Sequence, residues 1–149
     1  QQTDNDAQRI KDAGASATQI NTGSACHLDA EMIHQALHKI DMENTKILII
    51  ENVGNMVCPT AYDLGENMKL SIVSCPEGED KPIKYPDLLL TSKVLLINKI
   101  DLLPYLDFDL DRCIKFSKQV NPDLEIFPVS AKSGEGIPEF VSWLEKNIN

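Results

Sequence analysis

The chain has 149 residues, 42% of them hydrophobic, and this length and composition predict one globular domain over residues 1–149 with a sizeable core. Acidic residues outnumber basic ones by 23 to 14, and the net charge of −9 argues against a protein that binds nucleic acid by neutralising phosphates. We expect neither a membrane span nor a signal peptide. The spacing of the four cysteines is unlike a secreted disulfide scaffold and favours a cytoplasmic location.

Short apolar runs alternate with amphipathic segments along the chain. The alternation predicts an α/β fold, with βαβ units around a mostly parallel sheet. The segments are Ala17–Asn21, Leu28–Ile40, Lys46–Glu51, Lys69–Ser74, Lys93–Asn98, Asp109–Val120, Glu125–Val129 and Ile137–Ile148. Continuous apolar runs at 47–50 and 94–97 are typical of central strands that are covered on both faces. Functional loops are then expected where the parallel strands end.

Candidate metal ligands lie in the first half of the chain. Cys26 and His27 directly follow the turn at 22–25, and Cys58 lies further along. Two thiolates and an imidazole suit Zn²⁺ or Ni²⁺, and they leave a fourth position for water or for a ligand from a second chain. From these residues alone, buried structural cysteines are the alternative. Cys75 and Cys113 are predicted to be small apolar residues, with Cys75 a minor candidate for a metal ligand.

A separate set of residues, mostly acidic, suggests a Mg²⁺ and switch region. Glu51 and Gly54 follow the predicted strand with the spacing of the D-x-x-G motif of GTPases, Glu replacing Asp. A hard oxygen ligand and a glycine that lets the backbone approach a phosphate are what such a site needs. Asp4 and Asp6 near the N-terminus are further Mg²⁺ candidates. The alternatives are a surface acid at a strand end and a solvated helix start.

The segment Asn98-Lys99-Ile100-Asp101 follows the apolar run 94–97 and predicts half of a guanine pocket. The Asp101 carboxylate can accept hydrogen bonds from the N1–H and N2–H₂ groups of guanine. Adenine has no amine at C2, so it would leave the carboxylate unpaired. Asn98 is expected to bond N7, and Lys99 to lay its alkyl stem along the base.

The other half of the predicted pocket is Ser130-Ala131-Lys132, which follows the second apolar run at 126–129. The backbone N–H of Ala131 is expected to face guanine O6. Neither motif is specific alone, since a strand that ends in a helix-capping turn also has this composition. Their order, with a helix-like segment between two strands, favours a guanine nucleotide, GTP or GDP.

Four longer segments resemble one family. They are Asn-Thr-Gly-x-x-Cys-His-Leu-Asp-Ala-Glu-Met at 21–32, Ile-Glu-Asn-Val-Gly-Asn-Met-Val-Cys-Pro at 50–59, Glu-Gly-Glu-Asp-Lys-Pro-x-Lys-Tyr-Pro at 77–86 and Asn-Lys-Ile-Asp-Leu-Leu-Pro-Tyr at 98–105. Together they closely resemble HypB, the GTPase that helps insert nickel during [NiFe]-hydrogenase maturation. The resemblance covers essentially the whole chain.

The resemblance implies a P-loop NTPase-like three-layer α/β/α fold of the SIMIBI class, which dimerises around bound nucleotide. It implies that Cys26, His27 and Cys58 form a Zn²⁺ or Ni²⁺ site at the dimer interface, and that Glu51 belongs to the Mg²⁺ and switch region. The implied partners are a second copy, hydrogenase maturation proteins and the hydrogenase large subunit.

The chain departs from this family in one important respect. It contains no G-x-x-x-x-G-K-[ST] phosphate loop, and we expect a GTPase domain without its first strand and loop. Because that loop supplies most of the grip on the phosphates, the chain is expected to bind GTP poorly and to hydrolyse it negligibly. Two other hypotheses remain open: a non-catalytic metal-binding dimerisation module, and a GTPase of the urease-accessory type.

Overall fold

A computed structural model describes residues 5–23 and 25–148. Its contacts divide the chain into two compact units, Gln1–Gly65 (unit 1) and Glu66–Asn149 (unit 2). Among the described residues, no helix is both long and apolar enough to cross a membrane.

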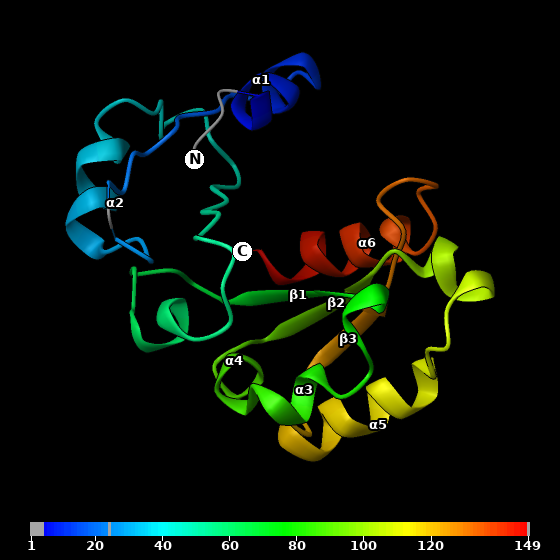
Figure 1. Cartoon of the computed structure of the whole chain (residues 1–149). Helices are drawn as coiled ribbons and strands as arrows, with labels where there is room; N and C mark the ends of the chain where they lie inside the picture. The colour runs from blue at the N-terminus through cyan, green and yellow to red at the C-terminus, as the bar shows by residue number, and fades with distance from the viewer. Residues whose placement is uncertain (1–4, 24, 149) are drawn as a thin grey trace. The chain divides into compact units, whose positions relative to one another are not determined.

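Unit 2 is built on a parallel sheet with strand order β1-β2-β3 (Figure 1). Ser74 at the end of the first strand pairs with Asn98, and Ile97 pairs with Pro128 at the end of the third, so the carboxyl ends of the strands lie at one edge. The strands are β1 (Leu70–Ser74), β2 (Val94–Asn98) and β3 (Glu125–Pro128). The predicted parallel sheet is therefore confirmed for three of its strands.

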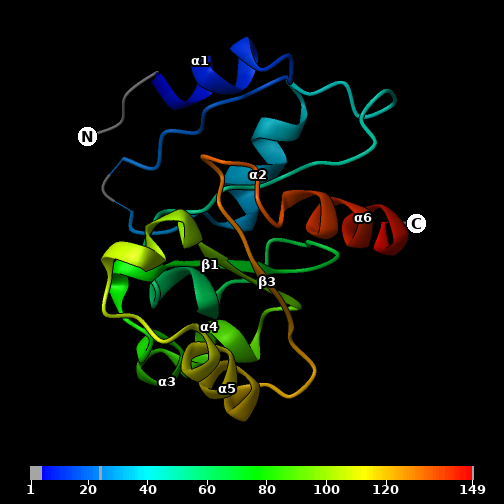
Figure 2. The ribbon, with the colours of Figure 1, turned by 90° about the vertical axis from the view of Figure 1, so that its right-hand side faces the viewer.

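Helices cover both faces of this sheet, which makes unit 2 a three-layer α/β/α structure (Figures 1 and 2). One face carries α3 (Lys81–Lys84), α4 (Pro86–Leu90) and α5 (Leu110–Val120), and the other carries α6 (Ile137–Asn147). Two short 3₁₀ turns follow the first two strands: η2 (Cys75–Glu77) comes directly after β1, and η3 (Ile100–Tyr105) comes one residue after β2.

The core of unit 2 surrounds β2, as predicted for a central strand. Val94, Leu95 and Ile97 are fully buried. Under α6, Phe127 and Trp143 pack against the cluster that contains Val94, with their ring centroids 5.9 Å apart. Alternate residues of β2 face opposite helical layers, so a strand covered on both sides needs apolar residues at every position.

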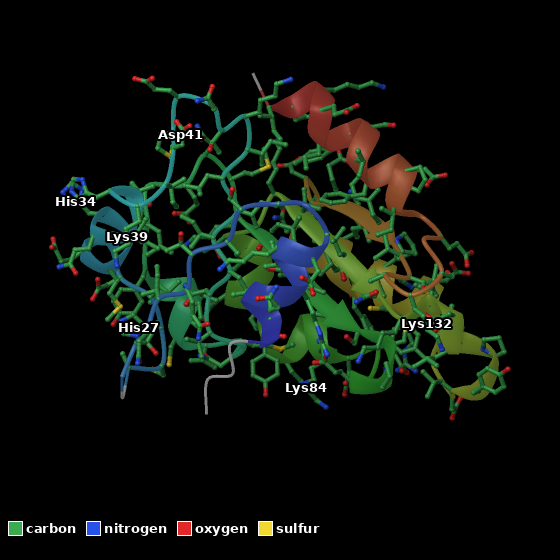
Figure 3. All side chains as sticks on the ribbon, turned by 90° about the horizontal axis from the view of Figure 1, so that it is seen from above. His27, His34, Lys39, Asp41, Lys84 and Lys132 are labelled. Atoms are coloured by element: carbon green, nitrogen blue, oxygen red, sulfur yellow. The ribbon has the colours of Figure 1, made fainter. Side chains whose placement is uncertain are left out.

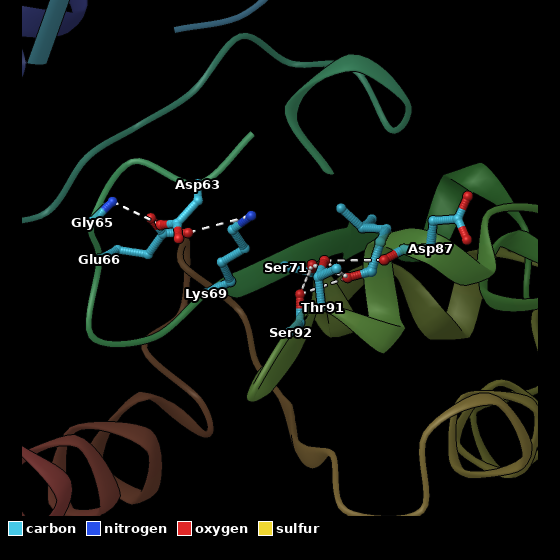
Figure 4. Close-up of polar contacts among 9 residues, drawn as sticks. Asp63, Gly65, Glu66, Lys69, Ser71, Asp87, Thr91 and Ser92 are labelled. Carbon is cyan, nitrogen blue, oxygen red and sulfur yellow. Dashed lines mark hydrogen bonds and ion pairs between the residues drawn. The ribbon is translucent and has the colours of Figure 1, made fainter. Parts of the chain in front are cut away.

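Buried hydroxyl groups link β1 to the end of α4, in the helical layer opposite α6 (Figure 4). The hydroxyl groups of Ser71 and Ser92 lie 2.5 Å apart, and Ser92 Oγ donates to the carbonyl of Leu88 at 2.7 Å. These bonds satisfy polar groups that burial would otherwise leave unpaired at a cost of about 1–3 kcal/mol each.

Unit 1 differs from the prediction, because its described residues form helices and loops but no strand. It contains α1 (Asn5–Asp12), α2 (Ala30–Leu37) and the 3₁₀ turn η1 (Cys58–Ala61). The strand expected within Lys46–Glu51 is wrong for this structure. A strand requires a neighbour that pairs with its backbone groups. With none in the described part of unit 1, even the apolar Ile49 is 79% exposed.

The amphipathic segment Leu28–Ile40, which we expect to be helical from its sequence, contains the α2 helix, but the helix is shorter than the segment. It begins at Ala30 because the Asp29 side chain caps it, accepting the backbone N–H of Met32 at 2.8 Å. The cap fixes where the chain turns out of the segment that carries Cys26 and His27.

Candidate functional site

The two predicted guanine motifs lie side by side in unit 2, in the loops that follow β2 and β3. The hydroxyl of Ser130, which is fully buried, donates to Asp101 Oδ1 at 2.6 Å. The same hydroxyl oxygen accepts the backbone N–H of Ser133 at 3.1 Å. This chain of bonds fixes the direction of the carboxylate, as base selection by two parallel hydrogen bonds requires.

Asn98 links the two loops. Its Oδ1 accepts the backbone N–H of Lys99 at 2.8 Å and that of Ala131 at 3.1 Å. The Ala131 N–H, predicted to face guanine O6, is thus already bonded, and a base carbonyl would have to share it. Sequence reasoning missed this link, because it gave Asn98 a role toward the base only.

The backbone of Lys99 is strained. Its φ is 66°, and among the described residues it is the only residue other than glycine with a positive φ. Left-handed backbone is unfavourable for a residue with a Cβ and is found mostly at functional turns. Here it ends β2 abruptly, so that Asn98 and Asp101 lie at the same edge of the sheet.

A glycine shapes the second loop. Gly136, which precedes α6, has a φ of +71°, and a Cβ added there would collide with the carbonyl oxygen of Pro128. The loop closes through two further backbone bonds, from Ser130 N–H to the Glu135 carbonyl and from Gly134 N–H to the Ser130 carbonyl. Lys132 is exposed in this loop (Figure 3).

The three predicted metal ligands approach one another within unit 1. Cys26 Sγ lies 2.9 Å from Cys58 Sγ and 3.7 Å from His27 Nδ1. The His27 ring stacks on the Tyr62 ring, with centroids 3.7 Å apart and planes 11° apart. Figure 3 shows His27 on the loop before α2. Cys26 is exposed and Cys58 is half-buried, so neither is the buried structural cysteine of the alternative hypothesis.

The donor set fits a borderline or soft divalent ion. Two thiolates bound to one ion at about 2.3 Å lie about 3.5–4 Å apart. The sulfur atoms of Cys26 and Cys58 would therefore have to move apart by only about 1 Å to bind the same ion. In the described part of the chain, however, no three or more His, Cys, Asp and Glu side chains already converge as a metal site. His27 would have to turn toward the thiol pair to complete three ligands.

The four cysteines divide into two chemical classes. Burial raises the pKa of Cys113 to about 11 and raises the pKa of Cys75, and both side chains are buried. The hydrogen bond that Cys58 shares with Cys26 raises the pKa of the Cys58 thiol. Cys75 and Cys113 thus behave as small apolar residues, as predicted.

We expect iodoacetamide to label Cys26 and Cys58 in the folded chain and to spare the other two cysteines, because only a thiolate that reaches solvent reacts. Cys26, the more exposed of the pair, is expected to react first. Mass spectrometry of the digested protein after native and denatured labelling measures this directly. Equal native labelling of Cys113 would contradict the buried assignment.

The structure does not bring the predicted Mg²⁺ and switch residues together as it does the two guanine motifs. Glu51 is exposed and does not follow a strand, because the run before it is unpaired. Gly54 has open space where a Cβ would lie, so local packing in the structure does not require glycine there. Asp6 is exposed and lies 3.6 Å from Arg9, and Asp4 lies outside the described residues.

The fold and site define a nucleotide-binding α/β domain, and comparison with known proteins specifies its family. The chain belongs to the CobW/HypB/UreG family of nucleotide-binding domains, whose model matches residues 1–128. Within that family it belongs with HypB, the hydrogenase maturation factor. It is 55% identical to HypB of Azotobacter vinelandii over 146 residues, which is 98% of this chain and 48% of that protein. The chain therefore spans about half the length of the curated relatives it matches.

Two solved structures resemble the whole chain. HypB from Archaeoglobus fulgidus has a TM-score of 0.91 and 35% identity, covering 100% of this chain and 72% of the other. HypB from Helicobacter pylori in complex with nickel has a TM-score of 0.91 and 38% identity, covering 97% and 69%. These similarities establish the P-loop GTPase fold of the HypB family for this chain.

Proposed function

We propose that the chain is the base-selecting and metal-binding part of a GTP-hydrolysing metallochaperone that supplies nickel to [NiFe]-hydrogenase. The observation that carries the proposal is the fixed carboxylate of Asp101, held by Ser130 beside the Asn98 to Ala131 bond. This arrangement provides two acceptors and a backbone donor at one edge of the sheet, which is the pattern that guanine complements.

In this proposal, Cys26, His27 and Cys58 hold the transported ion, Ni²⁺ or Zn²⁺. The support is the 2.9 Å thiol separation and the neighbouring imidazole. Thiolate and imidazole ligands favour these ions over Mg²⁺, which prefers oxygen and would accompany GTP at Glu51, Asp4 or Asp6. The ion complex of the Helicobacter pylori relative agrees with nickel as the cargo.

The proposed partners are a second copy of the chain, other hydrogenase maturation proteins and the hydrogenase large subunit, in the cytoplasm. We propose that GTP and Mg²⁺ order the segment around Glu51 and Gly54, which moves the thiol-bearing loops and couples nucleotide state to metal affinity or dimerisation. Such coupling is reciprocal, so the metal shifts nucleotide affinity by the same factor. Hydrolysis then times the release of the metal.

Nickel affinity measured with GDP and with a non-hydrolysable GTP analogue tests this proposal on a protein of the relatives' full length. We expect different affinities in the two nucleotide states. Identical affinities would rule out coupling between nucleotide state and nickel binding.

Replacing Cys58 with serine is expected to weaken Ni²⁺ and Zn²⁺ binding by the chain at least about tenfold, because it removes one of two thiolate ligands. Cys113→Ala is the matched control, since it removes a thiol that is buried in unit 2. Calorimetric titration measures both. Unchanged binding in Cys58→Ser would remove this residue from the metal site.

A second candidate function is a metal-binding dimerisation module without catalysis. It is favoured by the location of all three candidate metal ligands in unit 1. Separate titrations of the chain with Zn²⁺ and with GDP distinguish the two. Metal binding without nucleotide binding supports the module.

A further inference from the structure

We propose that Asn52 and Asn55 mechanically connect the switch segment (Glu51–Asn55) to the ligand loop (Ala25–Leu28), with Asn55 as the residue that holds the two thiols together. The inference rests on the proposed function, because it names how the metal site is regulated. All the contacts that carry it lie within unit 1.

Asn55 uses both ends of its amide. Its Nδ2 donates to the carbonyl oxygen of Cys26 at 2.7 Å. Its Oδ1 accepts the backbone N–H of Cys58 at 2.8 Å and that of Val57 at 3.1 Å. One side chain therefore bonds directly to the backbone of both cysteines, which are 32 residues apart in the sequence.

Asn52 makes a second connection to the same loop. Its Oδ1 accepts the backbone N–H of Leu28 at 2.9 Å and its neighbour's N–H, from Val53, at 2.8 Å. Leu28 is buried, so this bond anchors the C-terminal end of the ligand loop, immediately before the cap of α2. The two asparagines thus hold the loop on either side of His27.

The bonds account for the short distance between the thiols. Bringing together two residues separated by a loop of this length costs chain entropy, and a 2.9 Å separation needs interactions that repay it. In the described part of the chain no disulfide joins the cysteines. The Asn55 bonds to the Cys26 carbonyl and to the Cys58 N–H perform this role.

The same bonds provide a route for regulation. Gly54 lies between the two asparagines and is exposed, and a Cβ added there would meet nothing, so a ligand can reach its backbone. A ligand that moves Gly54 must carry Asn52 and Asn55 with it. Because Asn55 is bonded to both cysteines, its movement changes the distance between the thiols and hence the fit for a metal ion.

The test uses two variants with the same change of charge. Asn55→Asp loses the donor to the Cys26 carbonyl but keeps the acceptor for Cys58. Asn52→Asp keeps the acceptor for Leu28 and Val53, and among the described residues the Asn52 amide makes its hydrogen bonds through Oδ1. The readout is the rate at which diamide couples Cys26 to Cys58 in the chain. Two thiols lose two electrons and two protons, one S–S bond forms, and the diazene is reduced to the hydrazine.

We expect coupling about tenfold slower in Asn55→Asp and within about twofold of wild type in Asn52→Asp, since one variant loses a hydrogen bond and the other does not. An unchanged rate in Asn55→Asp overturns the proposal. Equal slowing in both variants also overturns it, because charge alone would then be the cause.

A measurement on the unaltered chain guards against misfolding of a variant. The backbone N–H groups of Leu28 and Cys58 are bonded to asparagine side chains, so their hydrogen exchange is expected to be slowed at least about tenfold relative to free-chain rates. If both N–H groups exchange at the rates of an unfolded chain, the proposal is overturned. These results are independent of nucleotide, whereas the proposed function fails separately if nucleotide state leaves nickel affinity unchanged in the full-length protein.

Discussion

Replacing Asp101 with asparagine is expected to weaken GDP binding by a protein of full length at least about 100-fold. The variant loses two charge-assisted hydrogen bonds to the guanine edge, each worth about 1.5–3 kcal/mol, and points an amide donor toward the N2 amine. The Ser130 hydroxyl holds the Asp101 carboxylate at 2.6 Å, which fixes the position of the acceptor that the variant lacks. Competition titration against a fluorescent guanine nucleotide measures the loss.

Xanthine nucleotides distinguish lost recognition from lost folding. Xanthine has a carbonyl where guanine has the C2 amine, so the Asp101→Asn side chain can accept from N1–H and donate to that carbonyl. We expect the variant to bind the xanthine nucleotide more tightly than wild type does. Asp107→Asn is the matched control, because Asp107 is exposed and outside the two motifs. Undiminished GDP binding by Asp101→Asn would remove the guanine assignment.

Replacing Gly136 with alanine is expected to lower the free energy of unfolding by about 3 kcal/mol or more. The new Cβ would meet the carbonyl oxygen of Pro128, which is backbone and cannot move aside, and the φ of +71° disfavours any L side chain. The strain falls on the loop that carries Ser130, so nucleotide selection is expected to weaken with stability. Urea unfolding followed by fluorescence of Trp143, the single tryptophan, measures the loss.

Gly134→Ala separates the two contributions. Gly134 also has a positive φ, +84°, but a Cβ there would have open space around it. We expect this control to cost about 1–2 kcal/mol, the backbone term alone. If both variants lost the same stability, the collision with Pro128 would not matter.

Local pattern was sufficient where a segment's structure depends on its own residues. The continuous apolar run of β2 predicted a strand buried on both faces, which the structure confirms. The base-binding role of the polar residues that follow it stays a prediction. The same reasoning paired Asp101 with the loop of Ser130, because parallel strands bring their carboxyl ends together. It failed at Lys46–Glu51, which has the same apolar character but no partner strand in the described part of unit 1.

The sequence alone therefore determined the family, the order of the motifs and the residue types at the candidate base and metal sites, since these depend on identity and spacing. Only the tertiary structure decided which side chains hold those residues in place. The Asn98 bond to Ala131 and the Asn55 bond to the Cys26 carbonyl join segments about thirty residues apart. No local pattern encodes such bonds, because an asparagine in a loop has many possible partners and the fold selects among them.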